Sequence, residues 1–585
     1  MEFQDLLDDL DGCINAPSHT FIEKYFGKAE SASCTSTSIG RISSKAPDIP
    51  STSTSSESFP EWFIKFATSE RDQSRGSWSI SAKDETHRER GLMDNCTQLS
   101  FILYDTQYKA TKPEAAIQTV GLVCPSDANY RDGLITLCAF AQTVFYKQPT
   151  RLFLHGFYIR GSLVELCTFD RSGLCFSEVM DAKKDADQFM SLFLHYERMT
   201  NHELGMSSIF TTDDEGQYIV LDQTNGGNSK LYIDSDPVVT RQTLVGPATV
   251  VYRARLPGAE SWSHAVKIKW PWARDRPESE LLEIAMEKKA WGALRLDLYR
   301  ELESTAHLRS GMVCCEQRRF PSNANAGDDD QGEDKKHTSS DAPSGIAHST
   351  EETKRSFLNR TLTCIVTSPL GRALQTFQTR LELLEVLRDV IKCHKSLYMD
   401  AGLLHGDISP GNMIIADKPD AGQPRGMLID LELATPRDPA PERDTSVICG
   451  TKSYMAIGYM QDEAKTYRHD LESFFYVFLW MVIGDRHGNV PEESRLRGWE
   501  DEGRSWFRLA LQKLSDMEAD HFQHIVDEIP PAFATLKGLA ETLRALLFPV
   551  RDGKVSAGTD ETAEGTDRLY DGILAAFDAA IASEE

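Results

Sequence analysis

Hydrophobic residues recur at strand or helix spacing along most of the chain, but two stretches lack them. After a short amphipathic stretch at residues 6–10, the chain turns to Ser and Thr from residue 31 to residue 58. Residues 321–355 are rich in Ala, Gly and Ser and include three consecutive aspartates. Neither stretch can bury enough apolar surface to fold by itself. The pattern therefore predicts a disordered Ser/Thr-rich head over residues 1–59 and a disordered insertion over residues 321–355.

Residues 60–240 carry the pattern of a smaller α+β domain. Apolar and polar positions typical of strands occur over residues 98–104, 152–159 and 164–169. Helical spacing occurs over residues 135–146 and 187–194. The polar run Asp170-Arg171-Ser172-Gly173 is predicted to be a turn. We find no catalytic constellation in this part of the chain.

Residues 241–585 form a third region, in which strands precede helices. A continuous apolar run at residues 362–367 predicts a buried strand, and helical spacing predicts a long helix over residues 381–399. The most apolar run, residues 474–483, is ten residues long. Because a bilayer requires about 20 such residues, we expect no membrane span. The fold class predicted for the chain is α+β.

Length, charge and cysteine spacing limit the classes of binding partner and the cellular compartment that we expect. At 585 residues the chain is too long for one hydrophobic core. Its 89 acidic and 63 basic residues give a net charge of −26, which argues against a nucleic acid or an anionic membrane as a general partner. The twelve cysteines show no CxxC spacing, and the N-terminus does not resemble a signal peptide. We therefore expect reduced thiols in an intracellular protein, without distinguishing cytoplasm from nucleus.

The most informative segment runs from His405 to Asn412. It contains Asp407, which is followed by Asn412 five residues later and by Asp430 eighteen residues after that. This spacing is typical of a phosphoryl-transfer site. In that chemistry one carboxylate accepts or orients the acceptor hydroxyl, and an amide and a second carboxylate hold magnesium against the phosphates of ATP. The candidates in this chain are Asp407 for the first task and Asn412 with Asp430 for the second.

A lysine that could contact those phosphates lies earlier in the chain. The segment at residues 244–254 reads as strand, turn and strand around Gly246, and Ala265-Val266-Lys267 follows it. That order predicts a phosphate-covering loop at Gly246 and a phosphate-binding amine at Lys267. Two alternatives stay open: residues 244–254 as an ordinary hairpin, and Lys267 as an apolar stem with a solvated tip. Lys269 lies on the same strand face, so the preceding Ala-Val pair decides between the two lysines.

Three acidic residues have two interpretations each. The helix that Pro277 opens places Glu278 on its inward face, as a partner for Lys267, although an exposed helix-start acid is the alternative. Glu432, two residues after Asp430, either faces the metal or forms a salt bridge. Asp470 either caps a helix or braces the backbone of the His405 loop.

In this order, the segments resemble the fungal-type protein kinase domain family, a divergent branch of the protein-kinase-like fold, over about residues 95–550. The most specific pieces are residues 148–151, 170–173, 405–412, 450–456 and 469–473. The resemblance implies a two-lobed protein-kinase-like domain, with a β-rich N-lobe and a helical C-lobe, over residues 241–585. It also implies ATP and Mg²⁺ as cofactors and transfer of the γ-phosphate to Ser or Thr hydroxyls of a protein substrate.

By the same resemblance, Lys267 grips the phosphates, Asp407 is the catalytic base, and Asn412 with Asp430 coordinates magnesium. The chain departs from the protein-kinase pattern at Gly406, Ser409 and Gly458, where Arg, Lys and Glu are usual, and it lacks the glycine after Asp430. Two alternatives therefore remain: an inactive pseudokinase that binds a partner, and a kinase of small molecules.

Overall fold

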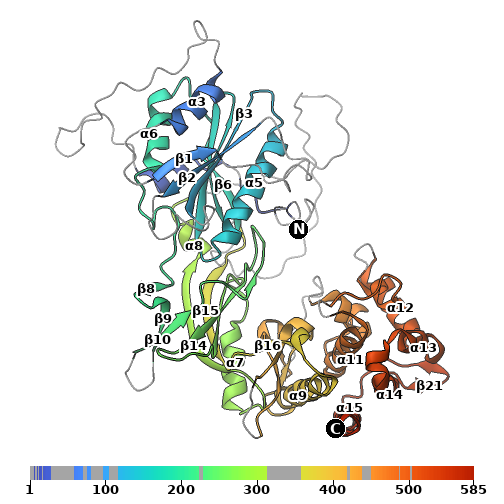
Figure 1. Cartoon of the computed structure of the whole chain (residues 1–585). Coiled ribbons are helices and arrows are strands. Elements are labelled where there is room, and N and C mark those ends of the chain that lie inside the picture. The colour runs from blue at the N-terminus through green and yellow to red at the C-terminus, as the bar shows by residue number, and fades with distance from the viewer. Residues whose placement is uncertain are drawn as a thin grey trace, which may run out of the picture.

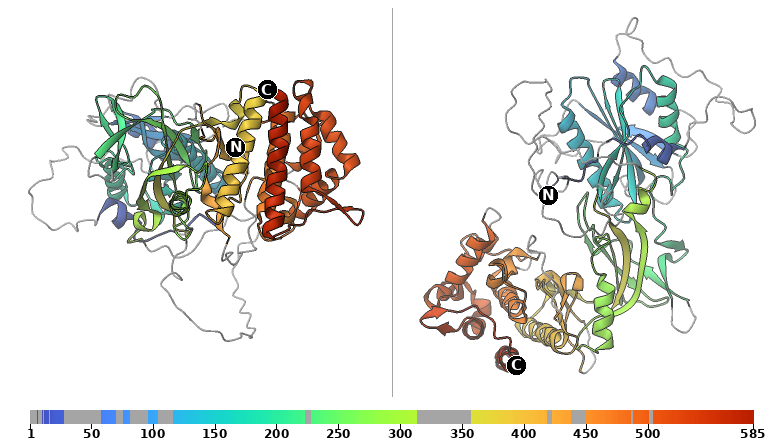
Figure 2. Two further views of the ribbon diagram at one scale, coloured as in Figure 1. Left: turned by 90° about the horizontal axis from the view of Figure 1, so that it is seen from below. Right: turned by 180° about the vertical axis from the view of Figure 1, so that it is seen from behind.

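The computed structural model contains two large β-sheets and a helical region (Figure 1), so the α+β fold class is confirmed. It describes residues 6, 10, 12–15, 17–27, 58–69, 76–80, 96–103, 116–222, 228–312, 357–417, 422–437, 450–485, 488–500 and 504–585. In Figure 1 the first sheet lies above the second, and the helical region lies beside the lower part of the second sheet. The view from behind in Figure 2 gives the same order.

The first sheet has the strand order β1-β2-β3-β4-β5-β6, with β7 paired to β5. Its strands are β1 (Gly76–Ile80), β2 (Thr97–Leu103), β3 (Ile117–Cys124), β4 (Phe153–Arg160), β5 (Leu163–Asp170), β6 (Gly173–Phe176) and β7 (Met180–Asp181). Only β3 and β4 of these pair in parallel, because α5 (Tyr130–Lys147) joins them as a crossover. Side chains of α5 fill one core, and those of α3 (Phe59–Thr68) and α6 (Ala186–Tyr196) fill another.

Two cysteines of the first sheet form a disulfide, Cys96–Cys124. The antiparallel register pairs Thr97 with Val123, which places the two cysteines opposite each other with Cα atoms 4.4 Å apart. The expectation that the cysteines are reduced thiols is therefore wrong for this pair. Sequence spacing missed it because register, and not distance along the chain, brings cross-strand residues together.

Part of the N-terminal head packs on the first sheet. The Asn15 amide donates to Leu174 O at 2.9 Å, and the Ser18 amide donates to Phe176 O at 2.9 Å. Phe21 opens α2 (Phe21–Phe26) and is fully buried. The predicted disorder is therefore wrong for these residues, because β6 offers them a sheet edge that sequence reasoning did not consider. Residues 28–57 and the insertion at 321–355 lie outside the described residues.

The second sheet has the order β14-β15-β13-β12-β10-β9-β8, with β11 paired to β12. Its strands are β8 (Thr211–Asp213), β9 (Gly216–Asp222), β10 (Asn228–Ile233), β11 (Val239–Thr240), β12 (Val250–Arg255), β13 (His264–Lys269), β14 (Arg295–Ser304) and β15 (Thr361–Ser368). Strands β8 to β10 come from the part of the chain that we grouped with the first sheet. They extend the second sheet instead, with β10 paired to β12, because Ile219 and Leu231 pack in the second sheet's core beside Val250.

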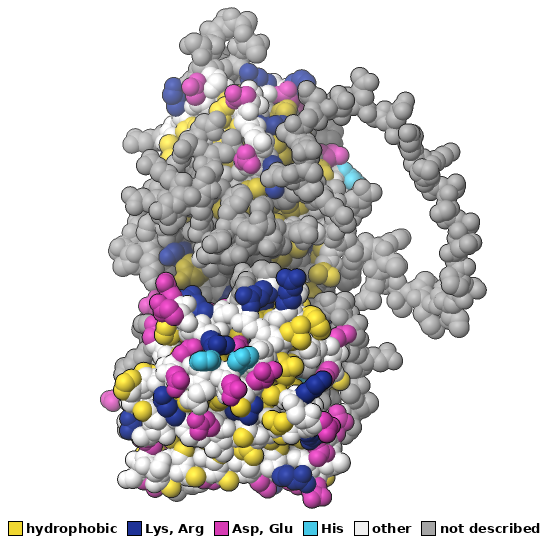
Figure 3. Space-filling view, turned by 90° about the vertical axis from the view of Figure 1, so that its right-hand side faces the viewer, with side chains coloured by type: hydrophobic (Ala, Val, Ile, Leu, Met, Phe, Trp, Pro, Cys, Tyr) yellow, Lys and Arg dark blue, Asp and Glu magenta, His cyan; other side chains and the backbone are white. Residues whose placement is uncertain are grey.

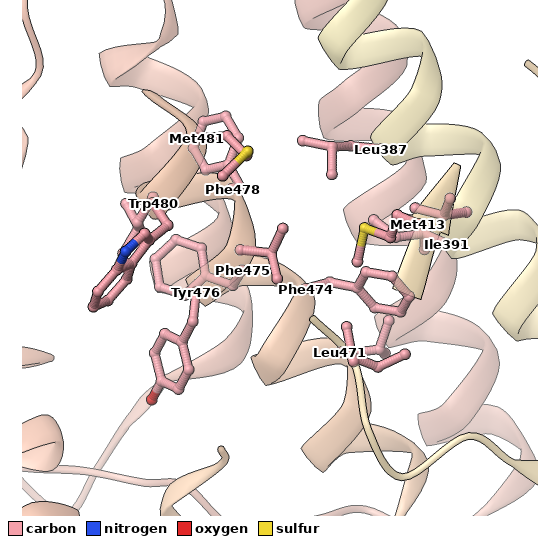
Figure 4. Close-up of a cluster of buried hydrophobic side chains, with 14 of the residues drawn as sticks. Leu387, Ile391, Met413, Leu471, Phe474, Phe475, Tyr476, Phe478, Trp480 and Met481 are labelled. Atoms are coloured by element: carbon pink, nitrogen blue, oxygen red, sulfur yellow. The ribbon is translucent and has the colours of Figure 1, made fainter. Parts of the chain in front are cut away.

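The helical region surrounds one long apolar helix. It contains α9 (Arg380–Met399), α10 (Ile457–Met460), α11 (Tyr467–Ile483), α12 (Trp506–Asp516), α13 (Ala519–Glu528), α14 (Lys537–Leu547) and α15 (Ala563–Glu584). Every residue of α11 is buried. In Figure 4, Leu471 and Phe474 lie beside Ile391 of α9 and Met413, whereas Trp480 points to the opposite side. Among the described residues, no helix combines the length and apolar character that crossing a membrane requires.

The two sheets meet in one hydrophobic cluster, the core of the second sheet. Leu152 and Phe153, at the start of β4, pack in a cluster with Val250 of β12 and with Trp270.

The surface that Figure 3 presents carries both signs of charge: acidic and basic side chains are interspersed over the helical region. On that face the excess of acidic residues does not form one continuous patch.

Candidate active site

Two lysines of the second sheet point to the same face of β13. Val266 and Ile268 are buried in the sheet core, so the alternation of side chains along the strand sends Lys267 and Lys269 to the opposite face. Strand β13 is held on both sides, with Lys267 opposite Val251 of β12 and opposite Ile365 of β15. Pairing on both edges fixes the height and direction of the two lysines.

Helix α7 (Glu278–Glu287) brings a carboxylate to both lysines. Glu278 Oε2 lies 3.0 Å from Lys267 Nζ and 3.0 Å from Lys269 Nζ. Glu280 points away and pairs with Arg276 on the surface. The inward position predicted for Glu278 by helical periodicity is confirmed, and the alternative of an exposed acid is excluded because Glu278 is 6% exposed.

A second acidic segment approaches the lysines from the helical region. Asp430 follows β19 (Gly426–Leu428), and its Oδ1 lies 2.8 Å from Lys267 Nζ. Glu432 Oε2 lies 2.9 Å from Lys269 Nζ. Of the two interpretations of Glu432, this structure has the salt bridge. Five charges thus alternate in a chain from Asp430 through Lys267, Glu278 and Lys269 to Glu432, which we call the charge ladder.

The opposite charges of the ladder favour the ionised forms of Lys267 and Asp430. Burial opposes the positive charge of Lys267, but Glu278 and Asp430 outweigh it and raise the pKa of the amine. Burial likewise opposes the negative charge of Asp430, yet Lys267 and Lys269 hold the pKa of its carboxyl well below the usual range. The ladder therefore places an ammonium and a carboxylate in contact, and each favours the charged form of the other.

Asp407 lies in a loop with two neighbours that fix its carboxylate. Asn412 Nδ2 donates to Asp407 Oδ2 at 3.0 Å and to Asp407 O at 2.8 Å. On the other side, Asp407 Oδ1 accepts from the amide and the hydroxyl of Thr451, both at 3.2 Å. A small recess that is open to solvent adjoins Asp407, Thr451 and Lys465.

Asp470 supports that loop from beneath. Its carboxylate accepts the amides of His405 and Gly406 at 3.1 Å, and it lies 2.8 Å from His394 Nε2. Burial opposes the charge of Asp470, but the hydrogen bond and the charge of His394 lower the pKa of the carboxyl. Among the two interpretations of Asp470, the brace of the His405 loop is the one present. The backbone conformation of Gly406, with φ of +75°, suits a glycine.

The loop and the ladder meet through Ile429, the residue before Asp430. The Ile429 amide donates to Asn412 O, and His405 Nε2 donates to Ile429 O, both at 3.0 Å. Asp407, Asn412, Asp430, Lys267 and Glu278 therefore form one connected group. The remaining predicted site residue, Gly246, instead donates its amide to Arg171 O of the first sheet at 3.0 Å.

Sequence reasoning missed two residues that hold the segment after Gly450. Thr451 bonds Asp407, as described above. Lys513 of α12 is fully buried, and its ammonium donates to the carbonyl oxygens of Ser453 at 2.8 Å and Met455 at 2.9 Å. The sequence feature that could have indicated Lys513 is a lysine on the apolar face of a helix. Lys513 therefore fastens the backbone of this segment at Ser453 and Met455.

Comparison with known protein families agrees with the geometry. A family model described as fungal protein kinase matches residues 100–482, more than half of the 585 residues. The match runs from β2 to α11 and includes the ladder and the Asp407 loop. No curated protein matches the chain significantly. The length of the family match shows that the chain belongs to the fungal protein kinase family.

Proposed function

We propose that the protein is an ATP- and Mg²⁺-dependent kinase that phosphorylates Ser or Thr hydroxyls of protein substrates. The observation that carries the proposal is the connected group of one amine and three oxygen-bearing side chains, Lys267, Asp407, Asn412 and Asp430. Family membership supports kinase chemistry in general. In this proposal the second sheet and the helical region act as the two lobes of the kinase-like domain, and the first sheet belongs to a separate, smaller domain.

Asn412 and Asp430 suit magnesium by their chemistry. Asn412 uses Nδ2 for both hydrogen bonds to Asp407, which leaves its Oδ1 as an acceptor, and Asp430 adds a carboxylate. Magnesium prefers oxygen ligands and usually keeps several from water or phosphate, so two protein ligands suffice. When bound, the ion would neutralise negative charge on the triphosphate.

Each residue then has one task. Lys267 contacts the phosphates, and Glu278 holds the ammonium in place. Asp407 orients the substrate hydroxyl and takes its proton while the hydroxyl oxygen bonds to the γ-phosphorus and the bond to the leaving ADP breaks. Thr451 and Asn412 keep the Asp407 carboxylate in position. Catalysis rests on positioning and charge neutralisation.

The test compares the wild-type protein with Asp407→Asn and Asp430→Ala. We expect Mg-ATP to raise the melting temperature of the wild type and a generic Ser/Thr substrate to be phosphorylated. Asp407→Asn should bind nucleotide normally and lose at least about 100-fold in kcat. Asp430→Ala should lose the magnesium-dependent part of nucleotide binding. The exposed Asp417→Asn, which pairs with Arg372, is the matched control and should behave as wild type.

Two results would replace the proposal. Nucleotide binding without transfer in wild type, unchanged by Asp407→Asn, would favour a partner-binding pseudokinase. Phosphorylation of small hydroxyl compounds but of no protein would favour a small-molecule kinase.

A further inference from the structure

The loop between β11 and β12 is anchored in the first sheet. Leu244 and Val245 are buried in the core that α5 forms with strands of that sheet. The next residue, Gly246, donates its amide to Arg171 O at 3.0 Å. The loop that we assign to cover the phosphates is therefore packed against the smaller domain.

Arg171 is the residue of the first sheet that holds this loop. Its side chain is buried, with 2% exposure, and its Nη1 donates to Thr243 O at 2.8 Å and to Leu244 O at 3.3 Å. The guanidinium lies over the ring of Phe145, 4.1 Å from the ring centroid. A buried guanidinium needs such acceptors, so the loop carbonyls and Arg171 depend on each other.

The turn that carries Arg171 is itself tied to the second sheet. Asp170 accepts two hydrogen bonds of 2.6 Å from Arg309, and both side chains are buried. Ser172 Oγ donates to Thr305 Oγ1 at 2.8 Å. These contacts hold the turn on both sides of Arg171, so Arg171 meets the loop from a fixed position.

Two residues of the loop have a left-handed backbone conformation, which contacts from outside the loop must stabilise. Gly246 has φ of +119° and Ala248 has φ of +46°, both in the left-handed region, which is unfavourable for alanine. On the other side of the loop, Pro247 O accepts the amide of Trp270 at 2.7 Å, just beyond Lys269 in β13. The loop is thus held between Arg171 and the strand that carries Lys267.

We infer that Arg171 is a positioning residue for the nucleotide: it fixes the loop of residues 241–249 and makes the smaller domain part of the ATP site. This inference rests on the proposed function for its catalytic consequence, but the anchoring itself does not. A loop held in advance costs less entropy when nucleotide binds. The smaller domain can therefore change ATP affinity without contacting ATP.

The experiment uses the full-length protein with Arg171→Ala and Arg171→Lys. Arg171→Ala should raise the KM for ATP about tenfold and change the kcat much less, because the loop contributes to binding and not to the proton transfer. Arg171→Lys keeps one donor and should fall between Arg171→Ala and wild type. Amide hydrogen exchange of residues 241–249 should become at least about tenfold faster in Arg171→Ala.

Met190→Ala is the matched control, because Met190 is a buried side chain of α6 in the other core of the same domain. It should lower the melting temperature without changing the KM or the exchange of the loop. Equal changes in Met190→Ala, or unchanged loop exchange and KM in Arg171→Ala, would overturn the inference.

If Arg171→Ala does not fold, Arg171→Lys carries the test alone. A rise in the KM for ATP and in the exchange of residues 241–249 above wild-type values is expected, and wild-type values of both would contradict the anchor. If wild-type protein transfers no phosphate, the proposed function fails, and loop exchange still decides whether Arg171 is the anchor.

Discussion

At the scale of single residues, the Asp407 carboxylate is held from two sides. Asn412 donates to Oδ2, and Thr451 donates to Oδ1. A carboxylate with both oxygens occupied has little freedom to rotate, so it keeps one orientation toward the adjoining recess. Loss of either donor should change the geometry of the proposed base more than its charge.

Thr451→Val tests this directly. The substitution keeps the shape of the side chain and the amide donor but removes the hydroxyl, so we expect kcat to fall about tenfold with the KM for ATP unchanged. Thr451→Ser retains the hydroxyl and serves as the control. Steady-state kinetics that give both variants the same kcat would contradict the role of the hydroxyl.

The outer end of the charge ladder gives a second prediction. Glu432→Gln leaves the buried Lys269 with Glu278 as its remaining partner in the ladder, so the free energy of unfolding should fall by about 1–2 kcal/mol. The control is Glu280→Gln, whose partner Arg276 is exposed, and its change should stay below about 0.5 kcal/mol. Urea unfolding measures the free-energy change of each variant. Equal changes in the two variants would contradict a structural role for the ladder.

The sequence could predict some of these residues and not others. Helical periodicity selected Glu278 over Glu280, and strand alternation placed Lys267 and Lys269 on one face. These periodicities could not show that both lysines share the Glu278 carboxylate. The Thr451 contact was also beyond them, because that hydrogen bond joins segments 44 residues apart.

At the scale of elements, the segment from Gly450 to Ile457 is fastened by the buried side chains of Lys513 and Glu472. Lys513 donates to its carbonyls, and the Ile457 amide donates to Glu472 Oε1 at 2.7 Å. Burial lowers the pKa of Lys513 to about 7. The folded protein therefore resists protonation of Lys513 more than the unfolded chain does.

The pH dependence of stability follows from that shift. Because the pKa in the folded state lies below the usual value of 10.5, the unfolded chain binds more protons between about pH 7 and 10.5. The contribution of Lys513 to the free energy of unfolding should thus rise with pH across this window, by at most about 1.4 kcal/mol per pH unit.

Denaturant unfolding of wild type and Lys513→Met at pH 7, 8 and 9 checks this prediction. The free energy of unfolding of the wild type minus that of Lys513→Met should increase as the pH rises. Lys537→Met, which changes a half-exposed lysine of α14, should show no such trend. A difference that is constant with pH would mean that Lys513 has an ordinary pKa.

Elements with a strong local pattern were predictable. The helix expected over residues 381–399 is found as α9, and the apolar run at residues 474–483 lies within α11. The position of β8 to β10 was not predictable, because short strands follow the same alternation in either sheet. Their pairing depends on which core receives Ile219 and Leu231.

At the scale of the whole molecule, the two sheets are joined by a buried ion pair as well as by the hydrophobic cluster in which they meet. Asp170 belongs to the first sheet, and Arg309 follows α8 (Thr305–Leu308) beyond the end of β14. Because both side chains are buried, the pair contributes to stability only while both charges are present. The two sheets should therefore unfold together.

Arg309→Met should cost about 3–5 kcal/mol, because it leaves the Asp170 charge buried without this partner. The control Arg253→Met removes a half-exposed arginine that pairs with Asp234, and it should cost less than about 1 kcal/mol. Calorimetry should show a single transition in wild type and a broadened or divided one in Arg309→Met. Equal, small losses in both variants would show that the ion pair does not couple the sheets.

The pairing of β10 with β12 has a practical consequence for anyone who wishes to express the second sheet and the helical region without the first sheet. A fragment that starts at Arg241 would lack β8, β9, β10 and β11, and would leave the edge of β12 that these strands cover without a partner. Open strand edges recruit other chains and aggregate. Truncation at that point should yield inclusion bodies, and a fragment that keeps Thr211 onward would still expose Leu244 and Val245.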